Sequence, residues 1–187
     1  DAVDLVDQYE AGLKWRRDGF SLFATAFFAE TEEQNFELTS QRFFDRVYEA
    51  RGIELEASLR FNEFFLNGGL TWTDAEISKD DISPANEGNT PRRQADVVYQ
   101  LTGGYAATNW TLGANIIGTG DAYAQDNNQL VMPGYTQVNL FADYRFAENW
   151  VVGLNVNNPY DALGITEAEE SSNVANTQNV IRARSDP

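Results

Sequence analysis

Alternation of apolar and polar side chains runs through most of this chain of 187 residues. The clearest example is residues 133–161, PGYTQVNLFADYRFAENWVVGLNVNNPYD, where two alternating runs are separated by a very short break. A period of two is that of a β-strand, whose successive side chains point to opposite faces. The helical spacing of i, i+3, i+4 and i+7 is nowhere sustained, so the pattern predicts an all-β protein.

The alternating segments occur in four pairs, each joined by a tight turn. The expected strands are residues 8–17 with 20–30, 52–61 with 66–73, 97–105 with 110–116, and 138–146 with 150–156. Segment 20–30 has apolar residues on both faces, which leaves its register open, and Phe141 is an apolar exception on a polar face. An aromatic residue follows each turn at once, and these residues are Phe20, Phe64, Trp110 and Trp150.

Short and long connections alternate along the chain, so that a hairpin recurs every 40 to 46 residues. The tight turns are residues 17–19, 62–63, 107–109 and 147–149, and the long polar loops are residues 31–45, 74–93, 118–133 and 158–178. In an up-and-down antiparallel meander, successive connections fall at opposite ends of the sheet. All short turns are therefore expected at one rim and all long loops at the other, an arrangement typical of a transmembrane β-barrel.

In such a barrel the apolar face contacts hydrocarbon and the polar face lines a wet lumen, and backbone groups pair between strands because lipid offers no hydrogen bonds. The four aromatic residues after the turns are then expected at the membrane interface as a girdle. The lumenal or ligand-facing candidates are Glu54, Glu56, Arg60, Asn139, Asp143 and Arg145. We expect Arg60 and Arg145 to form lumenal charge pairs near the short-turn rim. A soluble antiparallel sheet with one buried face gives the same alternation and stays an alternative.

Composition excludes several functions. With 13 Lys and Arg against 29 Asp and Glu, the net charge of −16 argues against nucleic acid as a partner. The chain has no cysteine and no histidine, which removes disulfides, thiolate or imidazole metal ligands, and nucleophiles of those types. GTGDAY, residues 118–123, lacks the third glycine of a nucleotide-binding loop. We therefore predict neither an enzyme nor a bound cofactor.

Acidic residues gather in the long loops, where they favour solubility at an exposed rim. The segment DAYAQDNN, residues 121–128, supplies Asp121 and Asp126 as weak candidates for a hard cation such as Ca²⁺. Its spacing fits no standard calcium loop, so the sequence predicts no metal site beyond these two carboxylates.

A family resemblance rests on a set of motifs in a fixed order. The motifs are YEAGLKW (9–15), YEARGIELEASLRF (48–61), NGGLTWTDAEI (67–77), TPRRQADVVYQL (90–101) and the stretch 133–161. Together they resemble the C-terminal part of the β-barrel of a TonB-dependent outer-membrane receptor. The resemblance implies about eight antiparallel strands, in an up-and-down meander, of a barrel that nominally has about 22.

The same resemblance implies that residues 1–187 are one portion of a barrel domain, without its plug domain, its TonB-engaging segment or its closing strand. Two departures stand out: Asn158-Pro159-Tyr160-Asp161 replaces a more usual Asn-Leu-Phe-Asp, and the chain stops at NVIRARSDP, about where the closing strand would begin. An incomplete barrel has two unpaired strand edges, so we expect the isolated chain to aggregate or to need a partner chain.

By resemblance, the expected partners are outer-membrane lipid, the rest of the barrel, the plug domain, TonB and a small-molecule ligand. The expected location is the bacterial outer membrane, and the expected function is active uptake of a scarce nutrient of the siderophore-iron, cobalamin or glycan class. Arg60 and Arg145 would then be able to contact the plug. Two alternatives are a passive porin-like outer-membrane barrel and a soluble all-β carbohydrate-binding module.

Overall fold

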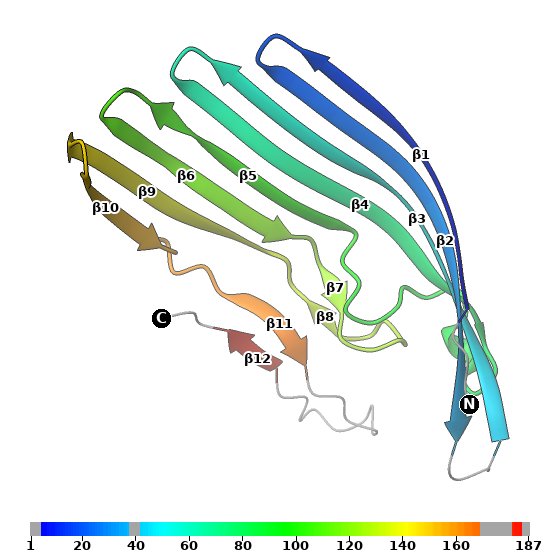
Figure 1. The fold of residues 1–187 in the computed structure, drawn as a ribbon. Coiled ribbons are helices and arrows are strands. Elements are labelled where there is room, and N and C mark those ends of the chain that lie inside the picture. Colours follow the sequence, from blue (N-terminus) through cyan, green and yellow to red (C-terminus); the bar gives the residue numbers. More distant parts are fainter. Residues whose placement is uncertain (1–4, 38–41, 169–180, 185–187) are drawn as a thin grey trace.

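Eight strands form one antiparallel sheet in the computed structural model, which describes residues 5–37, 42–168 and 181–184. The strands are, in sheet order, β1 (Leu5–Arg17), β2 (Phe20–Glu37), β3 (Arg42–Phe61), β4 (Phe64–Asp80), β5 (Val97–Ala106), β6 (Trp110–Thr119), β9 (Tyr135–Ala147) and β10 (Trp150–Asn157). The sheet is a curved, open wall with β1 and β10 at its two edges (Figure 1). This arrangement confirms the predicted all-β meander.

The four hairpin turns lie at one end of the sheet, at the top of Figure 1, and the long connections lie at the other. Positive φ angles at Gly19 (73°) and Asn62 (52°) allow two of these turns to be tight. The long connections contain a 3₁₀ helix, η1 (Pro84–Asn86), and two small antiparallel pairs. These pairs are β7 (Ala122–Tyr123) with β8 (Val131–Met132), and β11 (Gly164–Ala168) with β12 (Ile181–Arg184).

All four expected loops contain some strand, which corrects the sequence-based boundaries. Besides the short strands β7, β8 and β11, three long strands reach into these loops: β2 continues to Glu37, β3 begins at Arg42 and β4 continues to Asp80. Most of the expected loop 31–45 therefore extends the pairing of β2 with β3. The period of two is lost there because apolar residues are adjacent instead of alternating, as at Phe43–Phe44 and Val47–Tyr48, although the backbone pairing continues through Glu32 opposite Val47. Part of the last expected loop, 169–178, lies outside the described residues.

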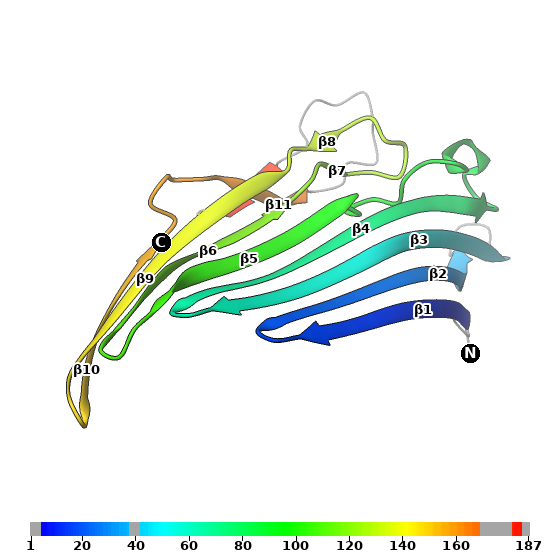
Figure 2. The same cartoon turned by 90° about the horizontal axis from the view of Figure 1, so that it is seen from above.

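One face of the sheet carries a broad band of exposed apolar side chains. The strand register places Leu55 opposite Leu70 and Leu140 opposite Val156 on that face. Exposure of the side chains is 38% for Leu55, 39% for Leu70 and 41% for Leu140. Figure 2 shows the same wall seen from above, where the eight strands form a single layer. No second layer of the described chain covers the apolar band, and among the described residues the only fully buried apolar side chains are Ile77, Ala124 and Met132.

Two phenylalanines that broke the alternation, Phe27 and Phe141, lie on the polar face, where each ring covers a glycine of the neighbouring strand. A Cβ added to Gly52 would be 2.5 Å from the Phe27 ring, and one added to Gly113 would be 2.7 Å from the Phe141 ring. Because these glycines have no side chain, the rings can lie flat against the neighbouring strand. This accounts for Phe27 and Phe141, whereas the third such ring, that of Phe23, lies opposite Glu56. No helix among the described residues is long and apolar enough to cross a membrane.

Candidate functional site on the polar face and its rims

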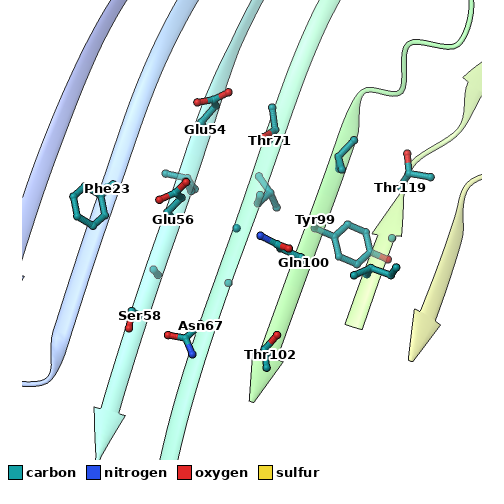
Figure 3. A pocket seen from close by; sticks show the side chains of 18 of the residues that line it. Phe23, Glu54, Glu56, Ser58, Asn67, Thr71, Tyr99, Gln100, Thr102 and Thr119 are labelled. Carbon is teal, nitrogen blue, oxygen red and sulfur yellow. The ribbon is translucent and has the colours of Figure 1, made fainter. Parts of the chain in front are cut away.

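The polar face of β2 to β6 is hollowed into a depression of about 770 Å³ (Figure 3). Its lining combines apolar side chains with hydroxyl, amide and carboxylate groups from adjacent strands. The polar side chains are those of Ser21, Glu54, Glu56, Ser58, Asn67, Thr71, Gln100, Thr102 and Thr119. Groups of this kind can form hydrogen bonds to a hydrated ligand or to another polypeptide.

Two of the predicted candidates, Glu54 and Glu56, lie together in this depression (Figure 3). Glu56 is opposite Gly69, which in turn is opposite Gln100, so a position without a side chain separates the carboxylate from the amide. A Cβ on Gly69 would be 3.6 Å from the nearest atom, Nε2 of Gln100, which is an ordinary contact. Neither carboxylate has an ion pair among the described residues.

A row of uncharged polar residues crosses the sheet in register. Ser58, Asn67, Thr102, Asn115, Asn139 and Asn157 face one another in turn on consecutive strands. Asn115 donates to Thr102 Oγ1 over 2.8 Å, and the predicted candidate Asn139 accepts from the Asn158 amide over 3.1 Å. Asn139 is thus part of a hydrogen-bonded wall.

The remaining predicted lumenal residues are not brought together. Arg60 is on β3 and Arg145 on β9, with β4, β5 and β6 between them, and Asp143 is opposite Gly153 of β10. Neither arginine has an ion pair with another described residue. The charge pairs expected for Arg60 and Arg145 therefore stay a prediction.

The four aromatic residues after the turns each contact a second ring near the short-turn rim. The pairs and ring-centroid distances are Trp15–Phe20 at 5.3 Å, Phe64–Tyr105 at 5.2 Å, Trp110–Tyr144 at 4.2 Å and Phe146–Trp150 at 6.2 Å. Such pairs contribute about 0.5–1.5 kcal/mol beyond the burial of their area. The sequence identified one member of each pair, and the partner becomes evident only from the register.

The long-loop rim is organised around Arg46 of β3, a residue that the sequence analysis did not single out. Its Nη2 is 2.6 Å from Asp80 Oδ2 and its Nη1 is 3.1 Å from Asp126 Oδ2. The Asp80 side chain is fully buried and also accepts hydrogen bonds from the amides of Ile82 and Ser83. Burial alone would raise the pKa of the Asp80 carboxyl, but the Ser83 amide and the Arg46 guanidinium outweigh it and lower this pKa.

The two weak cation candidates both have protein partners. Asp126 uses one oxygen for Arg46 and the other for the backbone amide of Arg92, at 3.0 Å. Asp121 accepts a hydrogen bond of 2.7 Å from the amide of Gly134. No group of three or more His, Cys, Asp or Glu residues within the described ranges is placed to hold a metal ion.

A second arginine–carboxylate pair lies on the same two strands and differs from the first in exposure. Arg51 donates through Nε and Nη2 to Asp74 Oδ2, at 2.9 and 2.6 Å. The side chains are 72% and 47% exposed, against 18% for Arg46 and none for Asp80. Solvent screens the Arg51 pair, so it contributes little to stability.

A curved antiparallel wall with one apolar face, one polar face, short turns at one end and long loops at the other is the architecture of an outer-membrane β-barrel. Residues 5–158 match the family described as TonB dependent receptor-like, beta-barrel, and the chain belongs to this family. The family consists of receptors and transporters, in agreement with the prediction that the chain is not an enzyme.

Known relatives agree on the fold. The chain is 30% identical over 123 residues to the metal-pseudopaline receptor CntO of Pseudomonas aeruginosa, a match that covers 60% of this chain and 16% of that protein. The siderophore receptor PiuA from Acinetobacter baumannii superimposes with a TM-score of 0.76 at 22% identity, over 87% of this chain and 25% of that one. The ferric yersiniabactin uptake receptor FyuA from Yersinia pestis gives 0.77 at 18% identity, over 97% and 28%. The chain thus spans between 16% and 28% of the length of these relatives.

Proposed function

We propose that this chain forms part of the wall of an outer-membrane receptor that takes up metal chelates with energy supplied through TonB. The apolar band faces hydrocarbon, and the polar face lines the path of the ligand. A plug domain, TonB and the remaining strands of the barrel are the partners. Membership of the receptor family supports each of these roles.

The observation that carries the proposal is the exposed apolar band on a single-layered sheet. Leu13 is 64% exposed on the edge strand β1 and Leu154 is 63% exposed on the opposite edge strand β10, and Leu55, Leu70 and Leu140 between them are 38–41% exposed. A soluble sheet would bury such a face against a second layer. Hydrocarbon can cover it without any further protein. This argues against the alternative of a soluble carbohydrate-binding module.

Metal chelates are the ligand class that the relatives favour. The similar proteins include a metal-pseudopaline receptor, two siderophore receptors and the ferric citrate transporter FecA. Of the three nutrient classes that the sequence left open, we therefore propose metal chelates over cobalamin and glycans. Glu54 and Glu56 would be hydrated side chains on the wall of the ligand path. Arg60 and Arg145 would donate hydrogen bonds to carboxylates or carbonyls of the plug.

The proposal is tested with the full-length receptor expressed in a strain that lacks its own receptors for metal chelates. Uptake of radiolabelled iron or zinc, supplied with purified siderophores or related chelators, should depend on the receptor and fall to background when TonB is deleted. Uptake that persists without TonB would instead identify a passive porin-like barrel. Uptake of labelled cobalamin or oligosaccharide, with none of the metal chelates, would overturn the ligand class.

A further inference from the structure

Two long connections at the long-loop rim are joined to each other by direct hydrogen bonds. They are the β4–β5 connection, residues 81–96, and the β6–β9 connection, residues 120–134. Asn128 donates to the Thr90 carbonyl over 2.7 Å and accepts from the Thr90 amide over 2.9 Å. Asn89 donates to the Asp126 carbonyl over 2.9 Å. The Arg93 amide donates to the Tyr123 carbonyl over 2.6 Å.

Arg46 fixes this joined pair to the sheet. Its guanidinium lies between Asp80, at the end of β4, and Asp126, in the β6–β9 connection, and donates to both. The Nε atom is buried without a partner among the described residues, so the terminal nitrogens make the side chain's hydrogen bonds. Three segments far apart in sequence thus meet at one side chain.

The positive charge of Arg46 keeps two carboxylates together that would otherwise repel each other. Asp80 and Asp126 contact the same guanidinium, so their carboxylates are close together, and both are largely shielded from solvent, at 0% and 14% exposure. Without Arg46 the two like charges would repel each other at low effective dielectric, and Asp80 would be buried without its cation. The hydrogen bonds between the connections are each modest, and they depend on residues 126–128 staying in place.

We propose that Arg46 is a positioning residue that holds the β4–β5 and β6–β9 connections together as one preformed wall of the long-loop rim. The wall exists before any ligand arrives, so this part of the rim does not have to order itself when a ligand binds. The effect on ligand binding rests on the proposed uptake function, whereas the joining of the two connections does not.

Tryptic cleavage at Arg92 and Arg93 tests the joining directly. Both residues are exposed, and their amides are held by Asp126 and Tyr123 across the junction. In the full-length receptor on intact cells, Arg46→Met should speed cleavage there at least tenfold, because cleavage requires local opening of the segment. The matched control is Arg51→Met, which removes the exposed ion pair on the same two strands and should change the rate less than twofold.

A disulfide provides a rescue that a general folding defect would not permit. Ala95 and Ala122 are antiparallel bridge partners, at a separation suited to a disulfide, and the chain has no cysteine of its own. Oxidised Ala95→Cys with Ala122→Cys should return the cleavage rate of Arg46→Met to within about threefold of the parent. A rate that stays high after oxidation, or an equal rise in Arg51→Met, would overturn the proposal.

Asp126→Ala keeps the test informative if Arg46→Met does not assemble. This substitution removes the ion pair between Arg46 and the β6–β9 connection and leaves the ion pair between Arg46 and Asp80 intact. Cleavage should rise severalfold, and an unchanged rate would contradict the proposed role. In the uptake assay, the same variant should raise the apparent KM severalfold at an unchanged maximal rate. Faster cleavage with an unchanged KM would mean that Arg46 joins the two connections but that this joining does not affect ligand binding.

Discussion

The two faces of the sheet have opposite chemistry although their residues alternate along the same strands. Leu140 is 41% exposed on a face that no other part of the described chain covers, while its neighbour Asn139 is hydrogen-bonded on the other face. Within the residues that the structure describes, the sheet therefore lacks the sandwiched apolar core that stabilises most domains. Its order comes from strand pairing, and its surroundings must complete each face.

The largest expected effect comes from a charge on the apolar face. Leu140→Arg should prevent outer-membrane assembly of the full-length receptor, because a lipid-facing arginine near the midplane costs about 2–4 kcal/mol. Asn139→Arg loses hydrogen bonds worth about 1 kcal/mol each but stays hydrated, so it should assemble. Assembly is measured by the amount of folded receptor in isolated outer membranes. Equal tolerance of the two changes would refute the assignment of the faces.

A smaller effect should distinguish two glycines of the polar face. A Cβ on Gly113 would be 2.4 Å from the Gly103 carbonyl oxygen and 2.7 Å from the Phe141 ring, whereas a Cβ on Gly69 would make only ordinary contacts, the nearest at 3.6 Å. Gly113→Ala should destabilise the barrel by about 1–3 kcal/mol through overpacking, and Gly69→Ala should be nearly neutral. Thermal unfolding of the detergent-solubilised receptor would measure both. If Gly69→Ala destabilised the receptor as much as Gly113→Ala, the depression would have no room for a methyl group at Gly69.

The aromatic pairs at the short-turn rim should contribute less. The stacked rings of Trp110 and Tyr144, with centroids 4.2 Å apart, predict a coupling of about 0.5–1.5 kcal/mol. A double-mutant cycle with Trp110→Ala and Tyr144→Ala, followed by thermal unfolding, isolates that coupling. Additive effects would mean that the rings act separately at the interface.

The last prediction concerns the response of the β4–β5 connection to pH, for which we expect no effect near neutral pH. The pKa of Asp80 is lowered in the folded protein, so its stabilising contribution is present above the ordinary carboxyl pKa of about 3.9 and is lost as the pH falls through the lowered value. Hydrogen exchange of residues 81–96, corrected for the intrinsic pH dependence of exchange, should be constant between about pH 8 and 5. It should accelerate only below about pH 4. Acceleration near pH 6 would point to another group.

The sequence was sufficient for the strands because the alternation reflects two different solvents. Leu55 and Glu56 are neighbours on β3 that face opposite sides, and this contrast repeats over all four hairpins. Where the strands extend past the apolar band, apolar and polar residues no longer alternate regularly and the pattern disappears. The expected loop 31–45 was wrong for that reason, although its backbone remains paired.

The rim cluster could not be predicted in the same way. Arg46, Asp80 and Asp126 come from three distant segments, and each looks like an ordinary charged residue in a polar region. Their meeting depends on the path of two long connections, which no local pattern specifies. The depression was partly predictable, because Glu54 and Glu56 are two residues apart on one strand and therefore share the polar face. Its shape at Gly69 depends on the residues that lie opposite across the sheet, which the sequence does not give.

The strands of this wall differ greatly in length, from 20 residues in β3 to 8 in β10. At roughly 3.3 Å per residue, the longer strand exceeds the shorter by about 40 Å. The apolar stripe on β3 ends at Ile53, so the segment 42–52 continues beyond it. If the long loops face the outside of the cell, as they do in outer-membrane barrels, this wall has a tall side at β2 and β3 and a low side at β10, and a large particle arriving from outside would meet β2 and β3 first.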